Sequence, residues 1–252
     1  MHKELINLPK NTTLDEIIDD PKRYPFFADC IRALDGTHLP IAIKGGYKQQ
    51  APWRGGKGIL TQNVLAAVNF NINFVYVLAR WEGTAHNCKV INSAKKKGFK
   101  APQGRYYLAN AGYSNTSITL VPYRGVQYHL CKQAQANMRP QNAKELFNLR
   151  HAGLRNVIER TFGIFKRRFR YFKAARQNFP LATQILLVYT LTAVHNFLNM
   201  HNQDDLEDYG VVEDEEDAQM AEEESEVAMN QRRDEIAELM WRGYCQAIGR
   251  PL

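Results

Sequence analysis

The chain has 252 residues, 44% hydrophobic and 11% aromatic, which is enough for one sizeable core or two modest ones. The longest apolar run near its C-terminal end, residues 185–188, is far too short to cross a bilayer, and the first residues lack a secretory signal. No two cysteines are closely spaced, which argues against a disulfide framework or a zinc knuckle: Cys30, Cys88, Cys131 and Cys245. We therefore expect a nuclear or cytoplasmic protein with no membrane partner.

The charge is distributed very unevenly. Residues 204–226 hold thirteen acidic residues and no Lys or Arg. Residues 21–203 hold 27 Lys and Arg against only five acids, which are Asp29, Asp35, Glu82, Glu145 and Glu159. A body with a net charge of +22 is complementary to a phosphate backbone, because binding releases condensed counterions. A basic protein with no nucleic-acid partner is the alternative.

In so basic a body, each carboxylate either pairs with a nearby cation or serves a purpose that needs negative charge, such as holding a divalent metal.

In chain order, residues 1–29 form an entry segment with a short helix, capped by Thr12 or Thr13. Short β-type runs follow, with a hairpin turn between the last two; they cover residues 30–35, 41–43, 61–70 and 74–81.

Residues 44–58 form a basic, glycine-rich loop that contains Tyr47 and Trp53. This loop is a candidate for phosphate contacts, and a solvated hairpin loop is an equally weighted alternative. A helix is predicted at about 85–97, followed by strands at 105–110 and 118–121. The segment 122–141 is irregular and basic.

From about residue 142 to 171 the apolar residues have helical spacing, which predicts a long helix whose stripe packs on the sheet: Leu154, Ile158, Phe162, Phe165 and Phe169. A last apolar helix at 181–200 should complete the core. The acidic segment 204–226 is predicted to be disordered, and residues 230–244 to form a short amphipathic helix. This order of strands and helices indicates an α/β or α+β layer architecture.

Two acids of the basic body are candidates for metal chemistry. Asp35 is predicted to close a strand, and Glu159 lies on the long helix expected to cross the same sheet. A strand-end Asp and a helical Glu can share divalent ions for attack on a phosphodiester. From these residues alone, an ion pair between Glu159 and Arg155, one helical turn away, explains the glutamate better.

A series of short motifs adds to this pattern. They are Asp35-Gly-Thr-His38, Gly58-Ile-Leu-Thr-Gln-Asn-Val64, Trp81-Glu-Gly-Thr-Ala-His86, Tyr107-Leu-Ala-Asn-Ala-Gly-Tyr113, Val121-Pro-Tyr-Arg-Gly125, Phe147-Asn148, Arg155-Asn-Val-Ile-Glu-Arg-Thr-Phe-Gly163, Lys166-Arg-Arg-Phe169 and His195-Asn-Phe197. The series, which covers about residues 30–200, resembles the PIF/Harbinger type of DDE transposase. The resemblance implies an α/β, ribonuclease-H-like fold with a mixed sheet flanked by helices. It also implies DNA cleavage with two Mg²⁺ or Mn²⁺ ions held by three acids.

By this resemblance the first acid falls on Asp35 and the third on Glu159. The second falls on position 110, where this chain has Asn110, and a further Asp usual after the Trp-x-Gly motif is replaced by Asn87. An amide oxygen can still contact a metal, but it removes one negative charge from a site for two dications. The resemblance thus implies catalytic and metal-binding roles for Asp35, Asn110 and Glu159, in a site impaired by decay, domestication or deliberate change.

We predict three parts: an entry segment at 1–29, a ribonuclease-H-like nuclease domain at 30–203, and an acidic disordered segment with a short C-terminal helix at 204–252. DNA contacts are expected from basic residues of the loop and the long helix: Lys44, Lys48, Arg54, Lys57, Lys166, Arg167 and Arg168. Transposases of this type usually carry an upstream DNA-binding region. With only about 29 residues before the first strand, we expect either a separate DNA-binding partner protein or a fragment.

A metal-dependent endonuclease, weakened at position 110, is the first hypothesis. A non-catalytic DNA-binding or adaptor protein that keeps the fold and the basic face is the second. A third is an interaction protein whose acidic segment binds basic partners or masks its own DNA face. Metal-dependent cleavage distinguishes the first hypothesis from the second.

Overall fold

The computed structural model describes residues 5–9, 11–55, 58–126, 139–175, 179–201 and 224–250. The chain divides into two compact units, each assembled from three stretches of sequence. Unit 1 comprises Met1–Pro9, Leu34–Lys100 and Val157–Asp214, and unit 2 comprises Lys10–Ala33, Ala101–Asn156 and Glu215–Leu252. One long strand and one long helix each contribute residues to both units.

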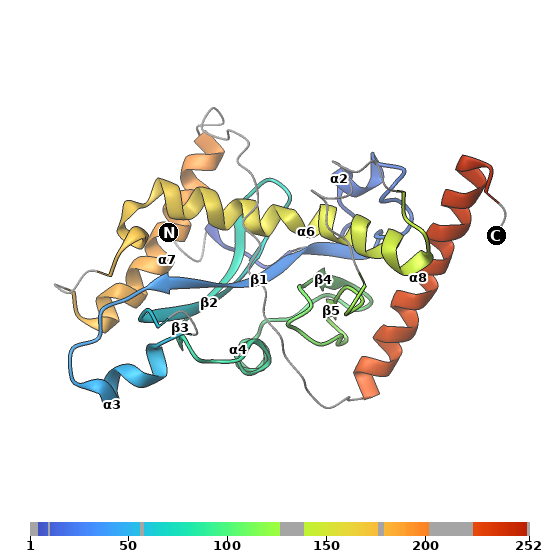
Figure 1. Cartoon of the computed structure of the whole chain (residues 1–252). Helices are drawn as coiled ribbons and strands as arrows, with labels where there is room; N and C mark the ends of the chain where they lie inside the picture. Colours follow the sequence, from blue (N-terminus) through green and yellow to red (C-terminus); the bar gives the residue numbers. More distant parts are fainter. Residues whose placement is uncertain are drawn as a thin grey trace. The chain divides into compact units, whose positions relative to one another are not determined.

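Five strands form one mixed sheet in the order β3-β2-β1-β4-β5 (Figure 1). They are β1 (Cys30–Pro40), β2 (Thr61–Val68), β3 (Phe74–Glu82), β4 (Tyr106–Leu108) and β5 (Thr119–Leu120). β2 and β3 are antiparallel, joined by the predicted turn, whereas β4 runs parallel to both β1 and β5. With helices packed on it, this sheet is the mixed α/β arrangement that the sequence predicted.

Unit 1 is built around β2, which is buried along its whole length. The apolar stripe of helix α6 (Ala143–Arg168) packs on β3, as predicted, since the rings of Phe162 and Phe165 lie 6.3 and 5.3 Å from that of Phe74. Helix α4 (Asn87–Lys96) is followed by Phe99, whose ring lies 4.4 Å from that of Tyr76 on β3. Figure 1 shows α4 and α6 on opposite sides of these strands.

Helix α7 (Leu181–His201) is bonded to the rest of unit 1 by buried amide side chains. Gln184 pairs with both the N–H and the C=O of Ala42, at 2.9 and 2.8 Å, and Asn196 pairs in the same way with Phe74, at 2.8 and 2.7 Å. By length and apolar composition, α7 could cross a bilayer, and a third of its most apolar stretch is buried. Its buried amide bonds to the backbone of Ala42 and Phe74 are those of a core helix.

Unit 2 contains the short helix α2 (Asp15–Ile18), strands β4 and β5, and helix α8 (Glu224–Ile248). α8 buries an apolar face at helical spacing that includes Met229, Ala237, Met240 and Cys245. Polar contacts fix its register: the Arg232 guanidinium binds the Asp29 carboxylate and the carbonyl of Gly104, and Tyr123 donates to Asp234 at 2.6 Å. α8 is thus a packed element of unit 2.

Three predicted strand and loop features were wrong. Asp35 does not close its strand, because β1 continues to Pro40 with Thr37 and Leu39 buried beyond it. Residues 41–43 are not a strand. The loop at 44–58 is partly helical, with α3 (Tyr47–Gln50) followed by a 3-10 turn, η1 (Ala51–Trp53).

Two helix boundaries also differ. α2 begins after Leu14 with no side-chain cap, and the hydroxyl of Thr13 instead binds Arg105 at 3.1 Å. α8 is longer than the predicted helix at 230–244, because its buried face extends the helical packing in both directions, so it includes the end of the acidic segment. The remainder of that segment, and the central part of the irregular stretch 122–141, lie outside the described residues.

Candidate active site

Asp35 lies in the middle of β1 in unit 1 and is only 7% exposed. Side chains alternate along a strand, so Asp35 shares a face with Ala33, Thr37 and Leu39, all of which are buried. Its Oδ1 atom accepts a hydrogen bond from the backbone N–H of Gly36 at 2.7 Å. A buried strand and a backbone donor together fix the orientation of this carboxylate.

Asn110 follows β4 in unit 2, on a turn braced by several hydrogen bonds. Its Oδ1 atom accepts the N–H of Gly112 at 2.8 Å, and its carbonyl accepts the N–H of Tyr113 at 3.1 Å. The guanidinium of Arg124 donates to the carbonyls of Ala111 and Tyr113, at 3.1 and 3.2 Å. An Asp carboxylate could accept the same Gly112 N–H, so the turn does not require an amide at position 110.

Glu159 lies on the part of α6 that belongs to unit 1, next to the fully buried Ile158. Two turns earlier on α6, in unit 2, His151 is completely buried, and its Nε2 atom is 3.1 Å from the carbonyl of Leu120. Burial lowers the pKa of His151 to about 3. His151 is therefore neutral near pH 7, and its complete burial and its bond to Leu120 give it a structural role, which leaves Glu159 as the candidate on this helix.

The donor chemistry of the three residues decides how well they fit a metal. Carboxylate and amide oxygens are the ligands that Mg²⁺ and Mn²⁺ prefer. Within the described parts of the chain, no group of three or more His, Cys, Asp or Glu side chains is arranged to hold an ion. Asp35 and Glu159 carry two negative charges and Asn110 none, which is one charge fewer than three acids would carry.

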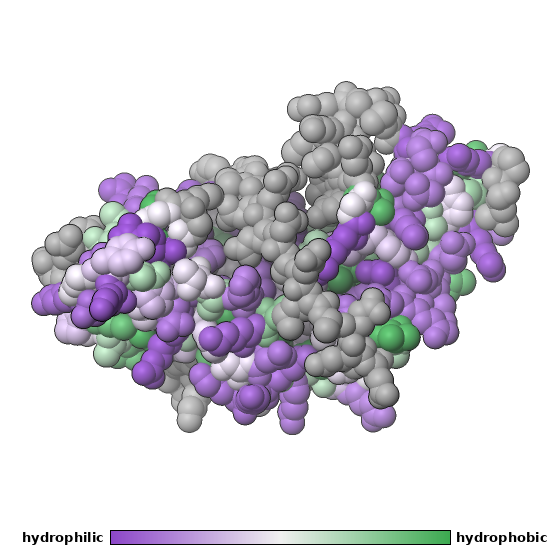
Figure 2. Space-filling view, turned by 60° about the horizontal axis from the view of Figure 1, so that its bottom comes forward, coloured by the Kyte–Doolittle hydropathy of each residue, from purple (hydrophilic) through white to green (hydrophobic). Residues whose placement is uncertain are grey.

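The structure places most of the predicted DNA-binding residues. Lys44, Lys48 and Arg54 are exposed in the loop of unit 1, and Lys57 lies outside the described residues. On α6, Arg167 is exposed and Lys166 half-buried. The face shown in Figure 2 is mostly hydrophilic, with hydrophobic side chains in small separate patches.

Arg168 has a different environment from the other candidates. Its Nη1 atom lies 3.1 Å from Nδ1 of His195 and 2.9 Å from Oδ1 of Asn199, both on α7. The guanidinium therefore joins the end of α6 to α7 inside unit 1.

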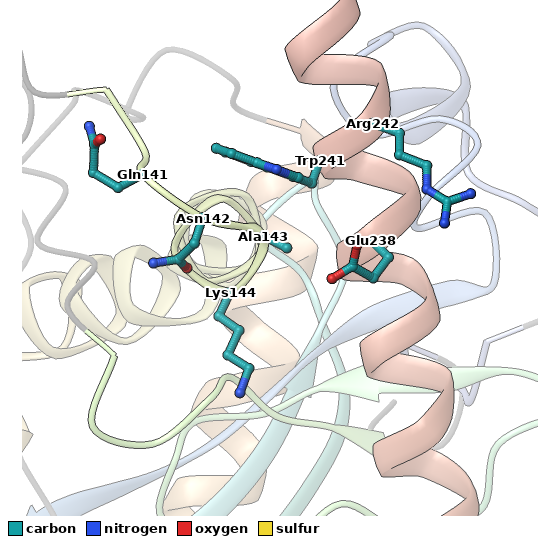
Figure 3. A pocket seen from close by; sticks show the side chains of 7 residues that line it. All are labelled: Gln141, Asn142, Ala143, Lys144, Glu238, Trp241 and Arg242. Atoms are coloured by element: carbon teal, nitrogen blue, oxygen red, sulfur yellow. The ribbon is translucent and has the colours of Figure 1, made fainter. Parts of the chain in front are cut away.

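An open pocket of about 610 Å³ lies in unit 2, between the start of α6 and α8. In Figure 3 the indole ring of Trp241 is directed toward the first turn of α6. The lining residues are Gln141, Asn142, Ala143, Lys144, Glu238, Trp241 and Arg242. The pocket contains a single carboxylate and none of the residues predicted to be catalytic, so it is not the candidate active site.

Comparison with known families identifies the chain. A family model described as DDE superfamily endonuclease matches residues 34–196, which is more than half of the sequence and includes positions 35, 110 and 159. The chain belongs to the DDE superfamily of endonucleases. This membership confirms the ribonuclease-H-like fold and the transposase-derived nuclease class, and it implies a DNA substrate. Endonucleases of this superfamily generally use divalent metals.

Searches among curated proteins and among solved structures gave no match. The family match ends before the last residues of α7 and does not include α8. The contacts of α8 with the rest of unit 2 are therefore shown by the structure and not by the family comparison.

Several motif residues have structural roles that sequence reasoning missed. Asn148 accepts the N–H of Tyr123 at 2.8 Å and donates to its carbonyl at 2.9 Å, which joins two of the motifs. At Gly83, a Cβ atom would lie 2.5 Å from Oγ1 of Thr61 and 2.7 Å from the carbonyl of Trp53, so no side chain fits. The signal in the sequence was the amide of Asn148 directly after Phe147, and the glycine at position 83 directly after a strand.

Proposed function

We propose that this chain is a PIF/Harbinger-type, transposase-derived DNA endonuclease domain whose catalysis is impaired at the second acid position. The observation that carries the proposal is Asn110. It occupies the acid position of the motif, on a turn whose hydrogen bonds an Asp would satisfy equally well. The amide therefore changes the charge of the site without being required by the local structure.

The motif series supports assigning Asp35 and Asn110 to one site. In the parallel pair of β1 and β4, Ala33 is aligned with Leu108. Asp35 and Asn110 each follow two residues later along their own segments. This pairing ends at Leu108, so the grouping of Asp35 with Asn110 rests on the motif series.

We assign the metal-binding role to Asp35, Asn110 and Glu159, with Mg²⁺ or Mn²⁺ as the ion. The two carboxylates would provide the charge, and the amide oxygen of Asn110 a neutral ligand. When bound, a divalent ion polarises the scissile phosphate and lowers the pKa of a coordinated water. The chain itself contributes the buried, hydrogen-bonded orientation of Asp35 and the braced turn at position 110.

The basic residues complete the proposal. Contacts with the phosphate backbone are assigned to Lys44, Lys48, Arg54 and Lys57 in the loop and to Lys166 and Arg167 on α6. Arg168 is assigned to the junction of α6 with α7, because its guanidinium bonds to His195 and Asn199. A separate DNA-binding partner and a nuclear or cytoplasmic location belong to the same proposal, as does the division into residues 1–29, 30–203 and 204–252.

Nicking of supercoiled plasmid in Mg²⁺ or Mn²⁺ tests the proposal. The unmodified chain should cut very weakly or not at all, and Asn110→Asp should raise the rate about tenfold or more, because a lost metal ligand commonly costs powers of ten. Asn71→Asp, in the exposed hairpin turn, adds the same charge elsewhere and should change nothing. Robust cleavage by the unmodified chain that survives Glu159→Ala would show that the site is misassigned.

A second candidate is a non-catalytic DNA-binding or adaptor protein that keeps the transposase fold. The neutral side chain at position 110 favours it. If Asn110→Asp binds plasmid DNA normally and still does not nick it, this second function replaces the first.

A further inference from the structure

The basic loop between β1 and β2 presents an aromatic ring to solvent. Tyr47, the first residue of α3, is 74% exposed, the largest value among the exposed large hydrophobic side chains of the described residues. Ile59, at the other end of the loop, is 57% exposed. By contrast, Trp53 is half-buried, and its carbonyl oxygen lies so close to Gly83 that a Cβ atom would not fit there. The loop therefore keeps one aromatic ring packed and leaves another in water.

Side-chain bonds hold the part of this loop from residue 44 to residue 54 in a defined conformation. The Gln50 amide donates to the carbonyls of Ile43 and Gly45, at 3.2 and 3.1 Å. Arg54 donates to the carbonyl of Gly58 at 3.0 Å, and its second Nη atom is 3.4 Å from Oε1 of Gln50. The ring of Tyr47 is thus presented by a folded segment, so binding to it costs less conformational entropy than binding to a flexible loop.

The charged residues near Tyr47 in the sequence all have one sign. Lys44, Lys48 and Arg54 are exposed, and the chain has no acidic residue between Asp35 and Glu82. An exposed aromatic ring among cations is the arrangement by which proteins bind unpaired nucleic-acid bases, with ring stacking on the base and cations on the flanking phosphates. In intact duplex the faces of the bases are already stacked on one another. A ring gains access to them only at gaps, overhangs or displaced strands.

We propose that residues 44–54 form a stacking platform for unpaired DNA bases, with Tyr47 stacked on a base and Lys44, Lys48 and Arg54 on the neighbouring phosphates. This inference rests on the proposed function only in taking DNA as the ligand. It adds a preference for DNA with unpaired bases over intact duplex. One stacked base contributes a factor of about 5 to 150 in affinity.

The test is fluorescence anisotropy without divalent metal, using a blunt duplex and the same duplex with a single-stranded gap. Tyr47→Ala should weaken binding to gapped DNA by about fivefold or more and leave blunt-duplex binding within about twofold. Tyr47→Phe should keep the preference, because the stacking ring remains. Lys48→Ala should weaken both complexes alike, since phosphates are present in both. Tyr24→Ala is the matched control, because Tyr24 is a tyrosine 47% exposed elsewhere in the chain.

A 2-aminopurine base placed in the gap gives a second readout. Its fluorescence should be quenched by the unmodified chain and by Tyr47→Phe, and not by Tyr47→Ala. Equal losses on both DNAs, or no loss on the gapped one, would overturn the stacking inference. Failure of the unmodified chain to bind either DNA would contradict the proposed function as well. An inactive nuclease leaves this metal-free test intact, because nicking is measured separately.

Discussion

Two buried histidines should make the protein sensitive to mild acid. His195 on α7 is fully buried; its Nδ1 atom accepts from Arg168 at 3.1 Å and its Nε2 lies 2.9 Å from the carbonyl of Ile72. Burial chiefly, and the Arg168 charge in addition, lower the pKa of His195 to about 4. Burial likewise lowers the pKa of His151 to about 3. In the unfolded chain both side chains should titrate near pH 6.5.

The sign and size of the effect follow from these pKa values. Because both folded pKa values lie below the unfolded value, the stabilisation is fully present above about pH 6.5 and is lost as the pH falls toward about 4. Each histidine costs about 1.4 kcal/mol of unfolding free energy per pH unit in that range. At about pH 5 the two together should remove about 4 kcal/mol, a large part of the about 5–15 kcal/mol typical of domains.

Urea unfolding at a series of pH values from about 7.5 to about 4.5 measures this loss. His195→Gln removes one titrating group and should reduce the pH slope of the unfolding free energy by about 1.4 kcal/mol per pH unit, whatever it does to stability at neutral pH. His86→Gln, at an exposed histidine, is the control. The reasoning is refuted if stability is flat between about pH 7 and 5, or if the two variants show the same slope.

Three further predictions concern packing and charge. Gly83→Ala should destabilise the fold by about 2 kcal/mol or more in thermal melts, because the added Cβ would overlap Thr61. The control Gly153→Ala, in open space on α6, should be neutral or slightly stabilising. Equal effects of the two substitutions would contradict this prediction. Duplex DNA affinity should fall steeply between about 50 and 200 mM salt, and a flat response would rule out the electrostatic interpretation. Replacing the eleven acids of residues 204–223 by Asn and Gln should tighten DNA binding, most at low salt; unchanged affinity would leave that segment without an electrostatic role.

Periodic patterns made the sheet and the long helices predictable. The stripe that includes Phe162 and Phe165 repeats at helical spacing, and burial on β3 is what such a stripe requires. The hairpin of β2 and β3 was predictable because two apolar runs are separated by a short Asn-rich turn. In both cases the signal is local, and the energy that stabilises the element comes from the same residues that produce the pattern.

Features that depend on distant partners could not be predicted in this way. The extent of β1 beyond Asp35 depends on burial of Thr37, a polar residue that a strand pattern would place at the surface. Asn148 bonds to Tyr123 and Asn196 to Phe74, and nothing in the sequence of either helix specifies these partners. α8 was predicted too short because its buried face, which includes Met229 and Cys245, extends beyond residues 230–244.

The candidate site, like the fold, was predictable from the sequence only in part. The motifs were sufficient to choose positions 35, 110 and 159, because residue type at those positions determines which ligands are available. They gave no indication that Arg124 braces the turn after Asn110, or that Gly36 donates to Asp35. Orientation of a ligand depends on such neighbours, and these contacts come only from the folded chain.

Binding of Mn²⁺, measured by titration calorimetry, tests most directly the central claim that Asn110 weakens a metal site. The experiment compares the unmodified chain, Asn110→Asp, the exposed control Asn71→Asp, and Asn110→Asp combined with Glu159→Ala. We predict that Asn110→Asp binds Mn²⁺ about tenfold or more tightly than the unmodified chain, that Asn71→Asp does not, and that Glu159→Ala abolishes the gain. Equal Mn²⁺ affinity and stoichiometry in all four proteins would contradict the account.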